Sequence, residues 1–451
     1  MEKDLIKGLR SEAVHLFRAS LEPVNPFEAV SRFVKTDGGQ LTLGAEGSAQ
    51  KALHLNEYKR IFIVGGGKAT APMAKAMEGI LGSRITHGTI NVKYGFTEEL
   101  AFTEIVEGGH PLPDRSGERG TKKILALLEN ATKEDLIFSL ISGGGSALLP
   151  QPVEGVTLEE KQAVTKMLLD CGASIDEINA IRKHVSISKG GQMARAAFPA
   201  TTINLMLSDV VGDRMDVIAS GPFVPDQSTF GEAWSILEKY DLLGKIPDSV
   251  QRHLNNGLVH AVPETPKGRD PIFSTVHNLV IGSNILALEA AREAALKLGY
   301  QPLILSSMVE GETRDAARVH TAIAKEIIKT GRPLSPPVCI ISGGETTVTV
   351  RGQGKGGRNQ EFGLTAAIDL KGQPKRVVIL SGGTDGNDGP TEAAGAVVDP
   401  ATLERGSDAG LDASAFLADN DAYHYLEKTG DLLITGPTNT NVMDVHLILV
   451  R

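Results

Sequence analysis

The hydrophobic pattern of the chain starts with helical spacing and then changes to short apolar runs. Between residues 3 and 21, Leu5, Leu9 and Phe17 fall on one side, which predicts an amphipathic helix packed on a core. From Arg60 onward, a short apolar run, a glycine cluster and a helix-like stretch follow one another repeatedly. This alternation is typical of a parallel sheet connected by helices, so we expect an α/β fold.

The strand–glycine–helix pattern is clearest in four segments. They are IFIVGGGKAT at 61–70, LIFSLISGGGSALL at 136–149, VCIISGGETTV at 338–348 and VVILSGGTDGNDGP at 377–390. A glycine cluster between a buried strand and a helix leaves several backbone N–H groups free, and the helix dipole adds positive potential, so anions bind there. Glycine is also the usual residue of a tight left-handed turn without a ligand, but four such turns favour phosphate or carboxylate binding. The candidate anion-binding residues are Gly65, Gly66, Gly67, Ser142, Gly143, Gly144, Gly145 and Ser146.

A proline-rich stretch breaks this rhythm. The segment HAVPETPKGRDPIF at 260–273 has mixed charges and little periodicity, as inter-domain connectors usually do. We therefore expect one domain over 1–260 and a second over 270–451. The elements expected in the second domain are a strand near 276–281, a helix near 285–298 capped by Ser283 or Asn284, a strand near 302–305, a helix ending at Gly331, a strand at 346–351 and a helix starting at Asn359.

The composition describes a globular protein. With 451 residues, of which 41% are hydrophobic and 22% charged, the chain has room for two or three domains and does not resemble a disordered or membrane protein. Its apolar runs are strand-length, so we expect no membrane span, and the mixed charges of the first residues give no export signal. Cys171 and Cys339 lie far apart without a CxxC motif, which favours a reducing cytoplasm over a disulfide framework or a zinc site.

The charge balance argues against a nucleic-acid partner. Lys and Arg total 46 and Asp and Glu total 55, which gives a net charge of -9, and no basic run is present to follow a phosphate backbone. Glycine is over-represented, with 50 residues, and the excess is clustered in the turns described above.

The familiar nucleotide and calcium fingerprints are absent. A Walker A loop ending at Lys68 needs a glycine where Phe62 stands and Ser or Thr where Ala69 stands. A GxGxxG motif that begins at Gly65 meets Thr70 at its third glycine position, and no acidic residue stands at the expected ribose position. An EF-hand at 385–396 is rejected because its last position is alanine instead of glutamate.

Two cations stand in glycine loops where helices are expected to begin. The helix dipole opposes a cation at that place, which suggests that something negative lies beside Lys68 and beside Arg358. Arginine can grip carboxylate or phosphate oxygens with two parallel hydrogen bonds. A solvated surface cation is the alternative for each residue alone. Because both lie in glycine loops, we favour a small anionic substrate held by Lys68 and Arg358.

Two carboxylates are candidates for a metal site. Asp209 follows the apolar run 203–207 and so lies at the carboxyl end of an expected strand, where a carboxylate can hold Mg²⁺. An ordinary turn before Gly212 explains it equally well. Asp385 remains a second candidate for Mg²⁺–phosphate binding, since hard cations prefer carboxylates together with waters and substrate oxygens.

Other residues give weaker signals. His110 could polarise a substrate, but a histidine in a proline-bounded loop is more often structural. The segment 182–184, together with Lys189, forms a small basic cluster that either lines an anionic pocket or is a solvated face. A hydrolase is not favoured, because Leu148 stands where the GxSxG elbow around Ser146 needs its final glycine.

The motifs taken together resemble a known family. The segments GGGKAT at 65–70, EGGHPLPD at 107–114, SGGGSALL at 142–149, INAIRKHVSISKGGQMA at 178–194 and LSDVVGDRMDVIASGP at 207–222 are similar to the amino-terminal half of the glycerate 2-kinases that carry a MOFRL domain. The segments SGGETTVTVRGQGKGGRNQEF at 342–362, SGGTDGNDGPTEAAGAVVD at 381–399 and TGPTNTNVMD at 435–444 are similar to the MOFRL domain itself, at about 336–446. In the last segment, Asn439 and Met443 stand where the family pattern leads us to expect Gly and Asn.

The resemblance implies a fold and an activity. It implies two α/β domains, the first a Rossmann-like parallel sheet with helices on both faces and the second of MOFRL type, with an active site in the cleft between them. It also implies ATP-dependent phosphorylation of glycerate, at the 2-hydroxyl, with Mg²⁺. The key pair of the family corresponds to Lys68 and Arg358 here. On this basis the 142–146 loop is expected to cradle ATP phosphates with Lys189, and Asp209 or Asp385 to position Mg²⁺.

Two functions of other classes stay open at this stage. One is a nicotinamide-dependent hydroxypyruvate reductase, against which the absent GxGxxG motif argues. The other is a non-catalytic sugar-acid-binding protein that uses the same loops. In each case the expected partner is a small anionic molecule and neither nucleic acid nor a membrane, and homo-oligomer formation is left open.

Overall fold

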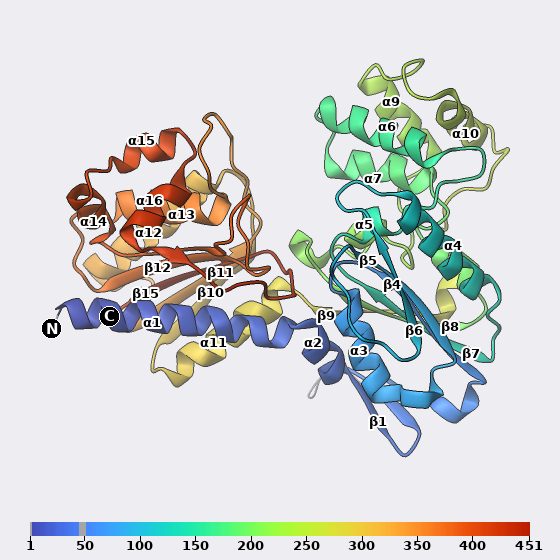
Figure 1. Cartoon of the computed structure of the whole chain (residues 1–451), viewed down its shortest axis with the longest axis horizontal. Coiled ribbons are helices and arrows are strands. Elements are labelled where there is room, and N and C mark those ends of the chain that lie inside the picture. Colours follow the sequence, from blue (N-terminus) through green and yellow to red (C-terminus); the bar gives the residue numbers. More distant parts are fainter. Residues whose placement is uncertain (1, 45–50) are drawn as a thin grey trace. The chain divides into compact units, whose positions relative to one another are not determined.

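The computed structural model describes residues 2–44 and 51–451, which form two compact units (Figure 1). The N-terminal unit consists of Pro26–Ser208 and Asp213–Ile281. The C-terminal unit consists of Gly282–Arg451, Asp209–Gly212 and the chain up to Asn25. Each unit is therefore built from separate stretches of sequence and not from one contiguous range, such as the 1–260 and 270–451 expected from the proline-rich segment.

The N-terminal unit is built on a six-stranded sheet with the order β6-β5-β4-β7-β8-β9. The neighbours from β6 through β8 pair in parallel, as the alternating pattern predicts. The strands are β4 (Arg60–Gly66), β5 (His87–Lys93), β6 (Thr103–Gly108), β7 (Asp135–Ile141), β8 (Thr201–Leu207) and β9 (Val276–Gly282). A separate antiparallel sheet is formed by β1 (Val34–Asp37), β2 (Gln40–Leu43) and β3 (Lys51–His54).

Both faces of the large sheet are covered, which explains why its central strands are continuously apolar. Alternate residues of β4, such as Ile63, share a core with α3, while Phe62 and Val64 are buried on the other face. The helix α4 contacts β4, β5 and β6, and its buried Ile124 lies outside the α3 core. The helices of this unit are α2 (Pro26–Phe33), α3 (Thr70–Leu81), α4 (Arg115–Glu129), α5 (Gly145–Leu148), α6 (Leu158–Asp170), α7 (Ile175–His184), α8 (Gln192–Ala197), α9 (Phe230–Lys239) and α10 (Asp248–Leu258).

The helices α6, α7, α9 and α10 gather away from the sheet and have a core of their own around Phe230 and Leu237 (Figure 1). The proline-rich segment 260–273 packs on this part. Thr265 donates a hydrogen bond to Asp226 at 2.9 Å, and the Asp226 N–H donates to the Pro266 carbonyl at 2.9 Å. The segment therefore belongs to the N-terminal unit, and the chain passes to the C-terminal unit at Gly282.

The C-terminal unit contains a mixed six-stranded sheet with the order β10-β11-β15-β12-β13-β14. Only β10 and β11 pair in parallel, and β15 lies antiparallel between β11 and β12. The strands are β10 (Gln301–Val309), β11 (Val338–Gly344), β12 (Val377–Gly383), β13 (Gly395–Val398), β14 (Leu432–Leu433) and β15 (Asp444–Val450). The helices are α1 (Glu2–Leu21), α11 (Asn284–Lys297), α12 (Thr313–Thr330), α13 (Arg358–Asp369), α14 (Thr402–Asp408), α15 (Ala413–Ala418) and α16 (Ala422–Thr429).

Helices from distant parts of the chain cover the two faces of this sheet (Figure 1). Cys339 and Leu447 face the core that contains α1 and α11. Ile340 and Ile448, one residue further along the same strands, face the core that contains α12, α13 and α16. The period of two in the strands thus assigns each residue to one layer. The expected amphipathic helix at the start of the chain is present, and it packs on the C-terminal sheet.

One expected strand is missing. The residues 346–351 form an extended loop with a single bridge from Thr347 to Glu312, and Val350 is exposed. β-branched residues predict a strand by propensity, but a strand also needs a neighbour along its length, which this segment lacks. Among the described residues, none of the helices combines the length and apolar character needed to span a bilayer.

Candidate active site

In the N-terminal unit, the loops after β4 and β7 lie side by side at the carboxyl edge of the sheet. From β4 the strand order runs outward through β5 and β6, and from β7 it runs the other way to β8. Open α/β sheets bind ligands at such a point, where the strand order reverses. The sequence-predicted residues Lys68 and Ser142–Ser146 follow these two strands directly, so the fold brings them together.

The loop after β4 is held against the loop after β7 by its own backbone. The Lys68 N–H donates to the Gly143 carbonyl at 2.9 Å, and the Ala69 N–H donates to the Ser142 Oγ at 3.0 Å. A Cβ at Gly65 would lie 2.1 Å from the Leu140 carbonyl oxygen, so glycine is required for this approach. The N–H groups of the first loop are therefore mostly engaged within the protein. What this loop offers to a ligand is chiefly the Lys68 side chain.

The loop after β7 differs, since several of its backbone N–H groups are not used within the protein. Within the described part of the chain, the N–H groups of Gly143, Gly144 and Ser146 have no acceptor. Gly144 has φ 83°, a left-handed conformation that glycine adopts without strain. The arrangement fits an oxygen-rich anion such as phosphate.

Lys68 is a partly exposed cation without a partner. Among residues 2–44 and 51–451, no hydrogen bond or ion pair engages its ammonium group. His110 lies beside it, since a Cβ at Gly144 would be 2.9 Å from the His110 ring and 3.4 Å from the Lys68 side chain. Burial, and then the charges of Lys68 and Lys93, lower the pKa of His110 to about 4. The imidazole is therefore neutral at neutral pH and can donate one hydrogen bond through one ring nitrogen and accept one at the other.

Ser146 and Lys189 belong to a buried support of the second loop. The Lys189 Nζ donates to the Ser146 carbonyl at 2.7 Å, and Lys189 is fully buried. The Ser146 hydroxyl lies 2.7 Å from the Ser220 hydroxyl. Ser220 and the preceding Ala219 have φ of 61° and 51°, which is strained for residues other than glycine. Backbone strain of this kind is concentrated at functional sites, so it supports a ligand-binding role for the loop after β7.

In the C-terminal unit, Arg358 is the first residue of α13 and is surrounded by carboxylates. Its Nε and Nη2 donate to the two oxygens of Asp444, at 2.6 and 3.0 Å, and its Nη1 donates to Glu345 at 2.9 Å. The negative neighbour that the helix dipole suggested is thus supplied by the protein. Asp444 is fully buried and fixes the plane of the guanidinium, while the Glu345 side chain is 44% exposed.

The start of α13 is capped from another segment. The Asp388 carboxylate accepts hydrogen bonds from the N–H groups of Asn359, at 3.1 Å, and Gln360, at 2.8 Å. The helix begins at Arg358 with Gly357 as its N-cap, one residue before the expected start at Asn359. The Asn359 side chain points inward and donates to Asp444 at 2.8 Å. A buried network therefore joins the cap to the Arg358–Asp444 pair.

Carboxylates outnumber cations around Arg358. Burial raises the pKa of Glu345, Asp388 and Asp444, and the carboxylates also act on one another. Asp209 acts on Glu345, and Asp385 acts on Asp444, so both metal candidates of the sequence lie near this cluster. Among the residues that the structure describes, however, no three acidic, histidine or cysteine side chains are placed to hold a metal ion by themselves.

A pocket of about 690 Å³ opens next to this cluster. Its lining comes from the 346–350 segment, the glycine loop before α13 and the loop after β12. Arg358, Asp385 and Asp388 all contribute to it. The pocket places the guanidinium and two carboxylates within reach of one small ligand.

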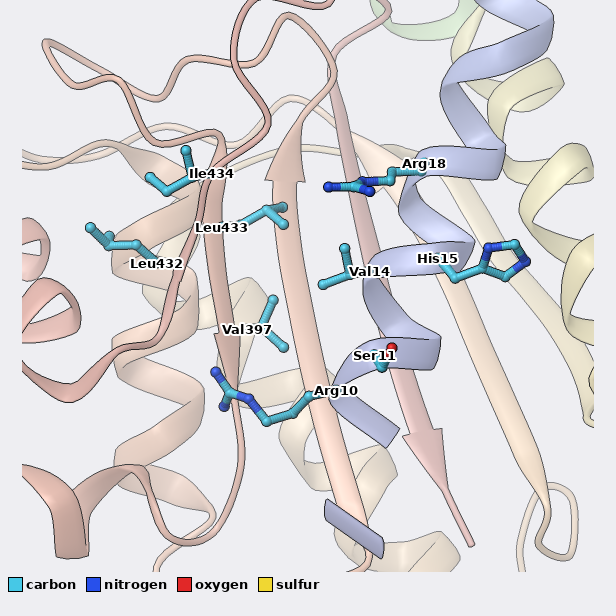
Figure 2. A pocket seen from close by; sticks show the side chains of 9 residues that line it. All are labelled: Arg10, Ser11, Val14, His15, Arg18, Val397, Leu432, Leu433 and Ile434. Atoms are coloured by element: carbon cyan, nitrogen blue, oxygen red, sulfur yellow. The ribbon is translucent and has the colours of Figure 1, made fainter. Parts of the chain in front are cut away.

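A second pocket in the C-terminal unit, of about 540 Å³, lies between α1 and the β13–β14 edge. Figure 2 shows Arg18 and Val14 extending from α1 toward Leu433, while His15 projects away from them. Arg10, at its rim, pairs with Asp399 at 2.7 Å and with Asp431 at 2.8 Å, which balances its charge. None of the residues singled out from the sequence lines this pocket.

Comparison with known proteins shows the family to which the chain belongs. A model described as a domain of unknown function (DUF4147) matches residues 12–255, and the MOFRL family model matches residues 338–444. A glycerate 2-kinase of Pyrococcus horikoshii is 40% identical over 98% of this chain and 97% of its own length. A D-glycerate 2-kinase of Thermotoga maritima is 41% identical over 98% of this chain and 99% of its own length. The chain belongs to the MOFRL-domain glycerate kinases.

The fold of these glycerate kinases is shared over the whole chain. A crystal structure of a glycerate kinase from Thermotoga maritima superposes with a TM-score of 0.88 and covers 99% of this chain and all of its own. One relative in the family, from Agrobacterium vitis, carries a different name, putative hydroxypyruvate reductase; it is 42% identical over 87% of each chain.

From the sequence, Lys68 and Arg358 were proposed as site cations, but not all of the residues that lie beside them were singled out. For His110 a structural role was ranked above the polarisation of a substrate, because its position next to Lys68 depends on two loops that are far apart in sequence. Asp444 and Glu345 were not singled out either. Asp444 lies 86 residues from Arg358, and only the antiparallel position of β15 beside β11 brings it close. The EGGHPLPD and TGPTNTNVMD motifs, which contain His110 and Asp444, were the signals that could have identified them.

Proposed function

We propose that this chain transfers the γ-phosphoryl group of ATP to the 2-hydroxyl of D-glycerate and releases 2-phosphoglycerate and ADP. The observation that supports this most is the free ammonium of Lys68 at the strand-order reversal, in a chain whose relatives are named glycerate kinases. In the reaction, the bond from phosphorus to the β–γ bridging oxygen breaks as the bond to the substrate oxygen forms, and the hydroxyl proton is released.

The loops of the N-terminal unit are assigned to the phosphates. The free N–H groups of Gly143, Gly144 and Ser146 would donate to phosphate oxygens, and Lys189 supports the loop through the Ser146 carbonyl. The glycines before Lys68 contribute by close packing, which holds the lysine next to that loop. Charge neutralisation and positioning are the main demands of phosphoryl transfer, and Lys68 meets the first of them.

The C-terminal unit contributes Arg358. Asp444 holds its guanidinium in one plane, and Glu345, the more exposed partner, would give way to the carboxylate of glycerate or to the moving phosphoryl group. The guanidinium then stabilises charge that develops in the transition state.

Mg²⁺ is the cofactor that the carboxylates near Arg358 fit. Burial, and then repulsion between neighbouring carboxylates, raises the pKa of Glu345, Asp388 and Asp444, and a divalent cation would relieve that repulsion. Mg²⁺ is usually held by one or two carboxylates, waters and substrate phosphates, so three protein ligands are not needed. Asp209 or Asp385 would supply the carboxylate, and the bound ion would neutralise the ATP phosphates.

A hydroxypyruvate reductase is the alternative suggested by one relative's name. A dinucleotide needs free N–H groups in the turn after the first strand for its pyrophosphate. Here the Gly67 N–H donates to the Asn91 carbonyl and the Lys68 N–H donates to the Gly143 carbonyl. We therefore expect no oxidation of NADH or NADPH in the presence of hydroxypyruvate, measured by absorbance.

Removing either cation tests the proposed roles. In a coupled assay for ADP with ATP, Mg²⁺ and D-glycerate, Lys68→Ala and Arg358→Ala should each lower kcat/KM by about 100-fold or more, because lost charge stabilisation at a transition state costs about 2.7–4 kcal/mol. The two residues belong to different units, so the two variants test each unit separately.

Matched controls use exposed cations from neighbouring helices. Lys75→Ala on α3 and Arg318→Ala on α12 should keep kcat/KM within twofold of the parent protein. If Lys68→Ala or Arg358→Ala kept kcat/KM within threefold, that residue would have no part in the transfer step.

A further inference from the structure

Three cationic side chains of the N-terminal unit interact without an acidic partner. They are Lys161 on α6, Arg182 on α7 and Lys189 in the turn before α8. Arg182 acts electrostatically on both lysines, and Lys161 acts on Lys189. Within the described residues, none of the three forms an ion pair with a carboxylate. We refer to them as the buried cation trio.

The trio is deeply placed. Lys161 is 6% exposed and Lys189 is 0% exposed, while Arg182 is partly exposed. The Lys161 Nζ is itself buried and has no hydrogen-bond partner. The Lys189 Nζ uses one donor on the Ser146 carbonyl, at 2.7 Å. Most of the donors of the trio are therefore unused.

A neighbouring lysine shows that the fold can neutralise a buried cation. Lys183, next to Arg182 on α7, pairs with Asp226 at 3.2 Å and with Asp216 at 3.5 Å. No comparable carboxylate faces the trio among the described residues. Burying unpaired charges is expensive, so a charged state of these side chains calls for an anion that arrives from outside.

The titration behaviour of the two lysines agrees with this. Burial, and then repulsion within the trio, lowers the pKa of Lys161 and Lys189 well below the usual range for lysine. Without an anion the amines therefore tend toward their neutral form. A neighbouring anion favours the charged form of both.

The number of cations indicates the class of ligand. A single carboxylate would balance only one of them, whereas a chain of phosphates carries several negative charges along its length. Arginine and lysine are the side chains that bind phosphate oxygens most often. The link from Lys189 to Ser146 also places this member of the trio next to the loop with free N–H groups. We propose that Lys161, Arg182 and Lys189 bind the phosphate chain of the nucleoside triphosphate, a proposal that rests on the proposed function.

Binding of phosphate compounds tests the trio independently of turnover. ATP and inorganic tripolyphosphate should each raise the Tm of the parent protein, because they bind the folded state, and adenosine should raise it much less. By calorimetric titration, Lys161→Met and Arg182→Met should each weaken ATP binding at least tenfold. The control Lys166→Met, exposed on the same helix and paired with Asp170, should change the affinity less than twofold.

Kinetics and stability distinguish ligand binding from a structural role. In Lys161→Met the KM for ATP should rise at least tenfold, while the KM for D-glycerate stays within threefold. Its Tm without ligand should equal or exceed that of the parent, since a buried amine without a hydrogen-bond partner has been removed. A Tm well below the parent's in both methionine variants would show that the trio is structural and would overturn the proposal.

Two further outcomes separate this inference from the proposed function. Unchanged ATP affinity in both methionine variants, in an enzyme that phosphorylates glycerate, would overturn the trio alone. A protein that binds tripolyphosphate through the trio but forms no phosphoglycerate would overturn the proposed function and leave the trio in place.

Discussion

At the scale of single residues, two opposing effects act on the pKa of Asp388 in the C-terminal unit. Its carboxylate caps α13 through two backbone N–H groups, which favours the charged form. Burial works against this and is the larger effect, so the pKa of Asp388 is raised to about 7. Gly357 permits the cap, since a Cβ there would lie 2.3 Å from the Asp388 carboxyl carbon.

The raised pKa predicts a pH dependence of stability. The folded protein keeps the Asp388 proton up to about pH 7, whereas the unfolded chain loses it near 3.8. Between these values the folded state binds more protons, so the free energy of unfolding should fall as pH rises. Denaturant unfolding from pH 4 to pH 8 should show a smaller fall for Asp388→Asn than for the parent, by on the order of a few kcal/mol. Identical pH slopes would contradict the raised pKa.

Some residues of the candidate site could be predicted from the sequence, and others could not. Lys68 and Arg358 were identified because a cation at a helix start is visible in one short segment. The partners of Arg358 were not, because they lie on other strands. Asn439 and Met443 have φ of 60° and 69°, a left-handed conformation that favours the Gly and Asn expected from the family pattern. The family pattern therefore identified two backbone constraints, although this chain meets them with other residues.

At the scale of elements, the glycine turns after β4 and β7 were predicted, but their different roles were not. The sequence predicted that each turn, between a strand and a helix, has free backbone N–H groups. In the structure the first is closed by hydrogen bonds to Asn91, Gly143 and Ser142, while the second keeps free groups. A sequence pattern places the turn, but only the neighbouring strands decide which N–H groups remain for a ligand.

Crowding at the second turn can be separated from backbone strain. Gly144 and Gly155 have nearly equal φ, 83° and 80°, but a Cβ at Gly155 would meet nothing within 4 Å. Gly144→Ala and Gly155→Ala should each destabilise the fold by roughly 1–2 kcal/mol, the cost of a left-handed residue. Only Gly144→Ala should also lower kcat/KM, by about tenfold or more, because its methyl group would displace the His110 ring, which lies beside Lys68.

Steady-state kinetics and thermal unfolding, measured on both alanine variants, distinguish crowding from backbone strain. An equal loss of activity in both alanine variants would mean that strain alone matters, and that His110 and Lys68 are not held in place by this turn.

At the scale of the whole molecule, the two ends of the chain build one unit. Leu16 and Phe17 of α1 are fully buried in the core that contains Leu447 of β15. The sequence predicted that the first helix packs on a core, but it could not say which core, because amphipathicity shows that a helix needs a partner without naming it. The α/β class and the parallel N-terminal sheet followed from the alternation of strands and helices. The mixed order of the C-terminal sheet did not, since β15 enters it from the end of the chain.

The most direct test of the central claim is to identify the product. The purified protein is incubated with ATP, Mg²⁺ and D-glycerate, and the phosphorus-containing products are resolved by ³¹P NMR. We predict equal amounts of ADP and 2-phosphoglycerate, absent without glycerate and strongly reduced in Lys68→Ala. Formation of 3-phosphoglycerate would contradict the 2-hydroxyl as the acceptor, and the absence of any glycerate-dependent ADP would contradict the kinase itself.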